Sequence, residues 1–145
     1  MAKSTVELVE KEKIIVIVRG VQPDKLLGLA EAMYKGGIRL LEITYSADGK
    51  MSDNDTAGNI AALKKHFGDE MSIGAGTVLT KKQVELTKDA GGEFIISPDS
   101  IPEVIEKTKE LGMVSMPGAL TPSEITLAHR SGADFVKVFP ASNLG

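Results

Sequence analysis

The segment DFVKVFP, residues 134–140, places a lysine in the middle of a short apolar run. Its β-branched and aromatic residues predict a strand, and the proline ends that strand. A lysine is rarely buried without a partner or a function, because burial disfavours its charged form and lowers its pKa. The alternative is a lysine that extends its amine to water or pairs with an acid. The rest of the chain has to decide between these interpretations.

Composition limits the possible functions. The chain has 145 residues, and we expect one domain over residues 1–145, large enough for a hydrophobic core. A net charge of −3 and an aromatic content of 4% argue against nucleic acid or an anionic membrane surface as a partner. The absence of cysteine excludes thiol catalysis and fits a cytoplasmic protein. No apolar run is long enough to span a bilayer.

Short apolar runs alternate with helical segments along the chain. Strands are predicted at residues 13–19, 38–44, 71–77, 93–97, 113–117 and 134–140. A further short helix is predicted at residues 4–11, where Ser4 and Glu7 have the spacing of a capping box. Strict alternation of strands and helices predicts parallel strands joined by helical crossovers.

The spacing of the strand ends favours a ring over an open sheet. Thr77, Ser97, Pro117 and Lys137 lie 20 residues apart, at the ends of four successive predicted strands. No Gly-x-Gly-x-x-Gly follows the first strand, which weakens the alternative of a doubly wound dinucleotide-binding sheet. We therefore predict the α/β class and a (β/α)8 TIM barrel, of which this chain supplies about six strand–helix units.

Alternation within strands predicts which side chains share the inner face of the barrel. The predicted inner set consists of Ile15, Ile17, Arg19, Leu40, Glu42, Thr44, Ile73, Ala75, Thr77, Ile95, Ser97, Ser115, Pro117, Phe135, Lys137 and Phe139. Polar members of this set gather at the carboxyl ends of the strands, where barrel enzymes carry their active sites. A purely structural network of ion pairs is the alternative explanation.

A lysine and a carboxylate on one face predict imine chemistry. The Lys137 amine would attack a carbonyl, and the resulting iminium would draw electrons from the adjacent carbon so that a carbon–carbon bond breaks. Glu42 would move the protons. The predicted substrate-binding set from the strand ends consists of Arg19, Thr44, Thr77, Ser97 and Pro117. The pattern contains no cluster of metal ligands, and both histidines fall in predicted helices, so we predict no metal and no cofactor.

Six motifs in a fixed order carry a family resemblance. They are IVRG at 17–20, GIRLLEIT at 37–44, GAGTVL at 74–79, FIISP at 94–98, MPG at 116–118 with TPSE at 121–124, and VKVFPA at 136–141. Together they resemble the bacterial 2-keto-3-deoxy-6-phosphogluconate / 4-hydroxy-2-oxoglutarate aldolases, over nearly the whole chain.

The resemblance implies a class I aldolase that cleaves a 2-keto acid to pyruvate and an aldehyde, without a metal and usually as a trimer. It implies Lys137 as the Schiff-base residue and Glu42 as the general acid and base. It further implies that Thr77 contacts the pyruvate half, and that Pro98 and Phe139 line its pocket. The expected partners are therefore a small 2-keto acid and further copies of the chain.

The chain departs from the family pattern at two places. The family commonly has an arginine four residues after the catalytic glutamate, where this chain has Ser46 followed by a polar insertion at 47–55. The sequence also stops at Gly145, whereas the phosphate-binding loops of such barrels follow strands seven and eight.

These departures lead to two expectations. We expect a chain ending at Gly145 to associate through its unpaired sheet edges and to cleave phosphorylated substrates poorly. The alternative function is a non-catalytic truncated barrel that keeps the catalytic residues but acts only as an assembly or binding piece.

Overall fold

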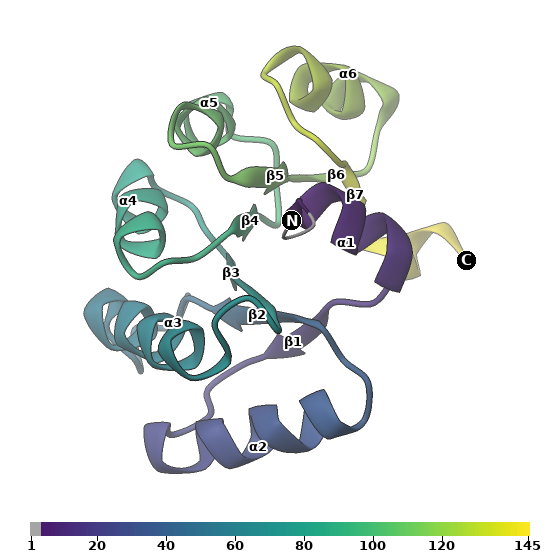
Figure 1. The fold of residues 1–145 in the computed structure, drawn as a ribbon. Coiled ribbons are helices and arrows are strands. Elements are labelled where there is room, and N and C mark those ends of the chain that lie inside the picture. Colours follow the sequence, from purple (N-terminus) through teal and green to yellow (C-terminus); the bar gives the residue numbers. More distant parts are fainter. Residues whose placement is uncertain (1–3) are drawn as a thin grey trace.

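The computed structural model describes residues 4–145 as an arc of parallel strands with helices around its convex side (Figure 1). The strands are β1 Val16–Val18, β2 Leu40–Thr44, β3 Ser72–Gly76, β4 Phe94–Ile96, β5 Val114–Met116, β6 Gly118–Ala119 and β7 Lys137–Val138. The first five form one parallel sheet in sequence order, and β6 and β7 form a second parallel pair. Neighbours in space are thus neighbours in sequence, which confirms the predicted barrel architecture.

Helices on the convex side alternate with the strands, as parallel crossovers require. They are α2 Pro23–Lys35, α3 Asp53–Phe67, α4 Lys81–Asp89, α5 Pro102–Glu110 and α6 Pro122–Arg130. The chain begins with α1, Thr5–Glu12, and ends with the 3-10 helix Ala141–Leu144. The predicted capping box of α1 is present, because Ser4 Oγ accepts from the Glu7 amide and the Glu7 carboxylate accepts from the Ser4 amide. Within residues 4–145, no helix is both long and apolar enough to cross a membrane.

The strands separate two hydrophobic clusters. The outer cluster fills the space beneath the helices and contains Leu41, Ile43, Ile73, Ala75 and Ile95 from the strands. The inner cluster consists of Leu40, Phe94, Ile96, Val114 and Met116, with Val6, Leu8 and Val9 of α1 packed against it. In Figure 1, α1 accordingly lies on the opposite side of the strands from helices α2 to α6.

The predicted inner face is correct for β1, β2 and β7 but wrong for β3, β4 and β5. Ile73, Ala75 and Ile95 face the outer helices, and Ser115 alternates with the inner residues Val114 and Met116. The inner face of β3 is formed instead by Ser72, Gly74 and Gly76.

The pairing register explains this error. The 20-residue repeat is the true register from β3 to β5, since Ala75 pairs with Ile95 and Ile95 with Ser115. Between β6 and β7 the offset is 19 residues (137 − 118), because Lys137 pairs with Gly118. A shift of one residue moves a side chain to the other face of a sheet. Lys137 therefore faces inward, although Pro117 and Ser97, which lie 20 and 40 positions before it, do not.

The predicted sixth strand is reduced to two residues, although its hydrogen bonding continues beyond them. The amides of Phe135, Lys137 and Phe139 donate to the carbonyl oxygens of Ser115, Pro117 and Ala119 at 3.2, 2.9 and 3.1 Å. Pro117 has no N–H, so the strand that it interrupts is divided into β5 and β6.

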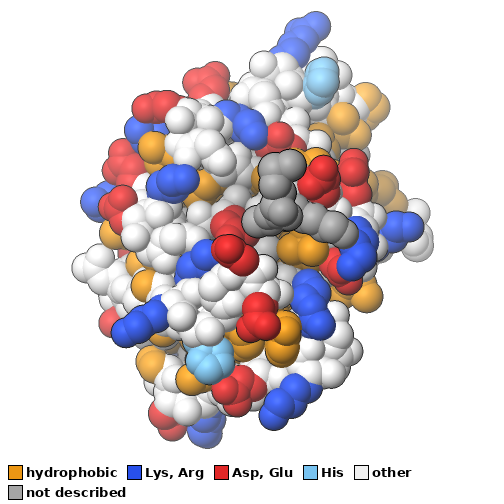
Figure 2. Space-filling model, in the orientation of Figure 1, with side chains coloured by type: hydrophobic (Ala, Val, Ile, Leu, Met, Phe, Trp, Pro, Cys, Tyr) orange, Lys and Arg blue, Asp and Glu red, His pale blue; other side chains and the backbone are white. Residues whose placement is uncertain are grey.

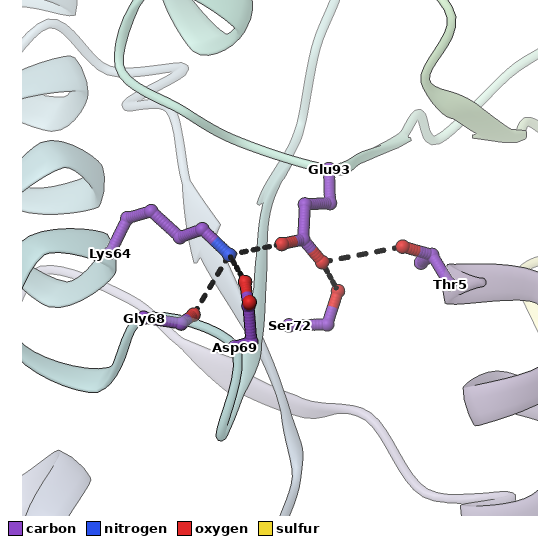
Figure 3. Close-up of polar contacts among 6 residues, drawn as sticks. All are labelled: Thr5, Lys64, Gly68, Asp69, Ser72 and Glu93. Atoms are coloured by element: carbon purple, nitrogen blue, oxygen red, sulfur yellow. Dashed lines mark hydrogen bonds and ion pairs between the residues drawn. The ribbon is translucent and has the colours of Figure 1, made fainter. Parts of the chain in front are cut away.

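A polar network joins α1 to the amino ends of the strands (Figure 3). The Glu93 carboxylate, just before β4, accepts hydrogen bonds from Ser72 Oγ at 2.5 Å and from Thr5 Oγ1 at 3.3 Å, and pairs with Lys64 of α3. This end of the molecule is in view in Figure 2, where acidic and basic side chains are interspersed around α1. The network holds α1 against the inner cluster, at the end opposite to the predicted site.

We expect Glu93→Ala to destabilise the chain by about 1–3 kcal/mol, because three donors lose their shared acceptor. Urea unfolding followed by circular dichroism measures the change. Glu10→Ala is the matched control, since Glu10 lies on α1 but is exposed, and it should change stability by less than about 0.5 kcal/mol. Equal effects of the two substitutions would contradict a tethering role for Glu93.

Candidate active site

The centre of the candidate site is a buried carboxyl group. Glu42 lies on the inner face of β2, between Ile17 of β1 and Gly74 of β3 in the pairing register, and is only 4% exposed. Burial raises the pKa of the Glu42 carboxyl, and the positive charges of Lys137 and Arg19 partly oppose this increase. Two cations predicted from separate strands therefore act electrostatically on this carboxyl group.

The two inner glycines of β3 make room for their neighbours. A Cβ atom on Gly74 would collide with the ring of Phe94, and one on Gly76 would collide with the Glu42 carboxyl. Glycine inside a strand often marks a position where a neighbouring part of the chain approaches closely. The structure identifies those neighbours and shows that Gly76 lets the Glu42 side chain lie across β3.

We expect Gly74→Ala to destabilise the chain by about 1–3 kcal/mol, because the new methyl group would overpack the fully buried Phe94 ring. Gly58→Ala is the matched control: a Cβ there meets nothing within 4 Å, and the position lies inside α3. The control should stabilise by up to about 1 kcal/mol through helix propensity. Urea unfolding of both variants tests the difference, and a shared sign would contradict the packing argument.

Lys137 reaches the inner face from β7. Its backbone amide donates to the Pro117 carbonyl oxygen at 2.9 Å, which fixes the strand beside β5 and β6. Its Nζ lies 4.2 Å from the centroid of the Phe139 ring, a cation–π contact with the residue that directly follows β7. The side chain is half-buried, so the amine remains accessible to a small ligand.

Arg19 and Thr77 meet at the carboxyl ends of β1 and β3. Arg19 Nη2 donates to Thr77 Oγ1 at 3.5 Å. Thr77 has a φ of 56°, a left-handed conformation that is rare for a β-branched residue. As a regular strand residue it would follow Ala75 toward the outer helices; the left-handed backbone turns its hydroxyl to Arg19 instead.

Thr44 adds a hydroxyl group whose hydrogen-bonding capacity is unused. It is the last residue of β2 and lies beside Arg19, because Ile17 pairs with Glu42 and Val18 with Ile43. Thr44 is 5% exposed, and its Oγ1 has no hydrogen-bond partner among residues 4–145. Buried hydroxyls are normally satisfied, so this one is available to a ligand.

The remaining predicted residues make supporting contacts. Ser97 is buried, and its Oγ donates to the Val78 carbonyl oxygen at 2.8 Å, which holds the loop after β3. Pro117 is buried and acts through its carbonyl oxygen on Lys137. Pro98 is half-buried, and its carbonyl oxygen lies so close to Gly118 that a Cβ there would collide with it.

The structure thus brings together Arg19, Glu42, Thr44, Thr77, Lys137 and Phe139, while Ser97 and Pro117 support the backbone around them. Sequence reasoning missed the contribution of the loop after β2, which it noted only as an insertion. That loop forms one wall of a cavity of about 480 Å³ beside Arg19 and Thr44. Among the described residues, no three His, Asp or Glu side chains are grouped so that they could hold a metal ion.

We expect the free energy of unfolding of the Glu42→Gln variant to increase, relative to that of the wild type, as pH rises. The folded chain holds the Glu42 proton to higher pH than the unfolded chain, because burial raises this pKa from 4.5. The stability that Glu42 contributes is therefore complete below about pH 4.5 and is lost as pH rises through the folded-state pKa. Glutamine stays neutral and avoids this loss.

Urea unfolding of the two proteins at several pH values between about 4 and 8 measures the effect. The exposed Glu10→Gln serves as the control. A difference in unfolding free energy between Glu42→Gln and the wild type that stays constant with pH would contradict the burial argument.

Fold and site together define a (β/α)-barrel protein with a lysine and a buried carboxyl group at the carboxyl ends of its strands. The family model described as KDPG and KHG aldolase matches residues 6–145. The chain therefore belongs to the KDPG and KHG aldolase family.

Named relatives and a solved structure agree with this assignment. The chain is 39% identical to a probable 2-dehydro-3-deoxy-6-phosphogalactonate aldolase of Rhizobium meliloti, over 91% of this chain and 59% of that protein. It is 34% identical to a 2-dehydro-3-deoxy-phosphogluconate aldolase of Treponema pallidum, over 96% and 63%. A KDPG aldolase from Legionella pneumophila, with pyruvate captured as a covalent carbinolamine intermediate, superposes with a TM-score of 0.79 at 30% identity, over 90% and 60%. The chain thus spans about three fifths of the length of these proteins.

Proposed function

We propose that this chain carries the catalytic residues of a class I aldolase barrel, which cleaves a 2-keto acid of the KDPG or KHG type into pyruvate and an aldehyde. The observation that carries the proposal is that the buried Glu42 carboxyl and Lys137 share one inner face, where the charge of Lys137 acts on the carboxyl. The pyruvate carbinolamine of the Legionella relative supports the same chemistry here.

The reaction begins with the attack of the Lys137 amine on the C2 carbonyl of the keto acid. The carbinolamine that forms loses water to give an iminium ion. Glu42 then takes the proton of the C4 hydroxyl, the C3–C4 bond breaks, and its electron pair moves toward the iminium nitrogen as the aldehyde leaves. Protonation of the enamine at C3 and hydrolysis release pyruvate and free the amine.

The environment of Glu42 suits this role. Burial raises the pKa of the Glu42 carboxyl above its usual value, which favours a group that has to accept a proton and return it during the reaction. The charges of Lys137 and Arg19 oppose this increase and favour the ionised form, which is the form that acts as a base.

Substrate binding is assigned to the residues at the strand ends. Arg19, with Thr77, would hold the carboxylate of the keto acid by a charge-assisted hydrogen bond. Pro98 and Phe139 would line the pocket of the pyruvate half, next to the amine.

Homotrimer formation and a cytoplasmic location, which rest on the family resemblance and on composition, stay predictions. The family match favours the enzyme over a non-catalytic barrel piece.

Borohydride reduction in the presence of pyruvate tests the role of Lys137. We expect one reduced pyruvyl group on the peptide that contains Lys137, and none in Lys137→Ala. Lys107→Ala is the control, because Lys107 lies on α5, on the outer side of the arc. An undiminished pyruvyl adduct in Lys137→Ala would contradict the assignment of Lys137 as the Schiff-base residue.

Where cleavage of a keto acid is measured, Glu42→Gln should reduce the cleavage rate by about 10²–10⁴-fold.

A further inference from the structure

A glutamine of the helical layer holds the loop that carries Thr77. Gln83 lies in the first turn of α4, and its Oε1 accepts a hydrogen bond from the Leu79 amide at 2.8 Å. Leu79 lies two residues after Thr77, the residue with the left-handed φ of 56°. The short loop between β3 and α4 is therefore tied to the helix that follows it.

The backbone on both sides of Thr77 is also held by neighbouring strands. On the amino side, the Tyr45 amide donates to the Gly76 carbonyl oxygen at 2.9 Å. On the carboxyl side, the Val78 carbonyl oxygen accepts from Ser97 Oγ at 2.8 Å. An unfavourable backbone conformation persists only where its surroundings enforce it. These hydrogen bonds and that of the glutamine provide the constraint for the left-handed threonine.

The amino group of the Gln83 side chain has a partner as well. Its Nε2 donates to Asp53 Oδ1 at 3.2 Å, and Asp53 is the first residue of α3, near the end of the polar insertion 47–55. A glutamate at this position could accept from the Leu79 amide but could not donate to Asp53. The Gln83 side chain therefore joins the loop after β2 to the loop after β3.

Two buried residues hold the backbone of Gln83. Its carbonyl oxygen accepts from the Tyr45 hydroxyl at 3.1 Å and from Thr87 Oγ1 at 2.8 Å, and both of these side chains are buried. Tyr45 directly follows Thr44, the last residue of β2. The position of Gln83 is therefore set by the core at the end of β2, although its own side chain is half-buried.

We propose that Gln83 is a positioning residue for substrate binding, which acts through Thr77. Its bond to the Leu79 amide holds the Thr77 hydroxyl toward Arg19, where the carboxylate of the keto acid would bind. Asp53 orients the Gln83 amide for this role. The inference rests on the proposed function, since it needs a keto acid whose carboxylate lies at Thr77 and Arg19.

Substitution of Gln83 should weaken the binding of the carboxylate. Gln83→Met keeps the length of the side chain and removes both of its hydrogen bonds. We expect the pyruvate concentration that gives half-maximal trapping at Lys137 to rise about five- to tenfold, as for one lost hydrogen bond. Asp53→Ala should raise it by a smaller factor. Asp53→Asn keeps an acceptor oxygen and should stay within about twofold of the wild type.

The experiment treats the full chain with cyanoborohydride and either pyruvate or acetone, and measures the adduct by mass spectrometry. Acetone has the methyl ketone of pyruvate without the carboxylate, so its trapping should change less than about twofold in Gln83→Met. Hydrogen exchange of the Leu79 amide should be faster in Gln83→Met and unchanged in Asp53→Asn. In a Thr77→Ala chain, Gln83→Met should have no further effect on pyruvate, because no hydroxyl is left to position.

Lys82→Met and Thr108→Val are the matched controls. Lys82 is exposed on the same helix α4, and Thr108 is buried in α5, where its Oγ1 donates to the Val104 carbonyl oxygen at 2.7 Å. Neither substitution should alter the pyruvate value, although Thr108→Val should lower the free energy of unfolding.

Three results would overturn the positioning role of Gln83: an unchanged pyruvate value in Gln83→Met, equal changes for pyruvate and acetone, or a full additional effect in the Thr77→Ala chain. An unchanged exchange rate of the Leu79 amide in Gln83→Met would overturn the route through this loop. A wild-type chain that pyruvate does not trap would instead overturn the proposed function, and the inference would fall with it.

Discussion

The site depends on a carboxyl group buried against a bare stretch of backbone. Glu42 can lie on the inner face of β2 only because Gly76 of β3 has no side chain where the carboxyl rests. Burial there raises the carboxyl pKa, and the cations of Arg19 and Lys137 limit the increase. The missing side chain at Gly76 therefore allows the Glu42 carboxyl to be buried, and the charges of Arg19 and Lys137 limit the resulting increase in its pKa.

The interior of the arc is divided between packing and chemistry. Near the amino ends of the strands, apolar side chains pack against α1, and Glu93 links α1 to β3 and α3. At the carboxyl ends, polar side chains from four strand segments replace the apolar ones. Folding stability and binding are thus assigned to opposite ends of the same strands, as in other barrels. The buried, unpartnered Thr44 hydroxyl is a cost that a bound ligand would relieve.

Backbone geometry places the remaining groups. The one-residue change in register before β7 turns Lys137 inward. A left-handed backbone at Thr77 brings a hydroxyl toward Arg19 that strand alternation would have sent outward. Both are departures from regular geometry, and both occur where the side chains of the site meet.

The sequence alone determined the order of strands and helices, the parallel barrel, and the roles proposed for Lys137 and Glu42, because hydrophobic period, caps and motifs are local properties of the chain. It did not determine which face β3, β4 and β5 turn inward. That choice depends on pairing offsets between strands and on which side chains fill the space above Gly74 and Gly76, which are properties of neighbours distant in sequence. The cavity walled by Asp48 and Lys50 likewise exists only once the loops after β1 and β2 lie side by side.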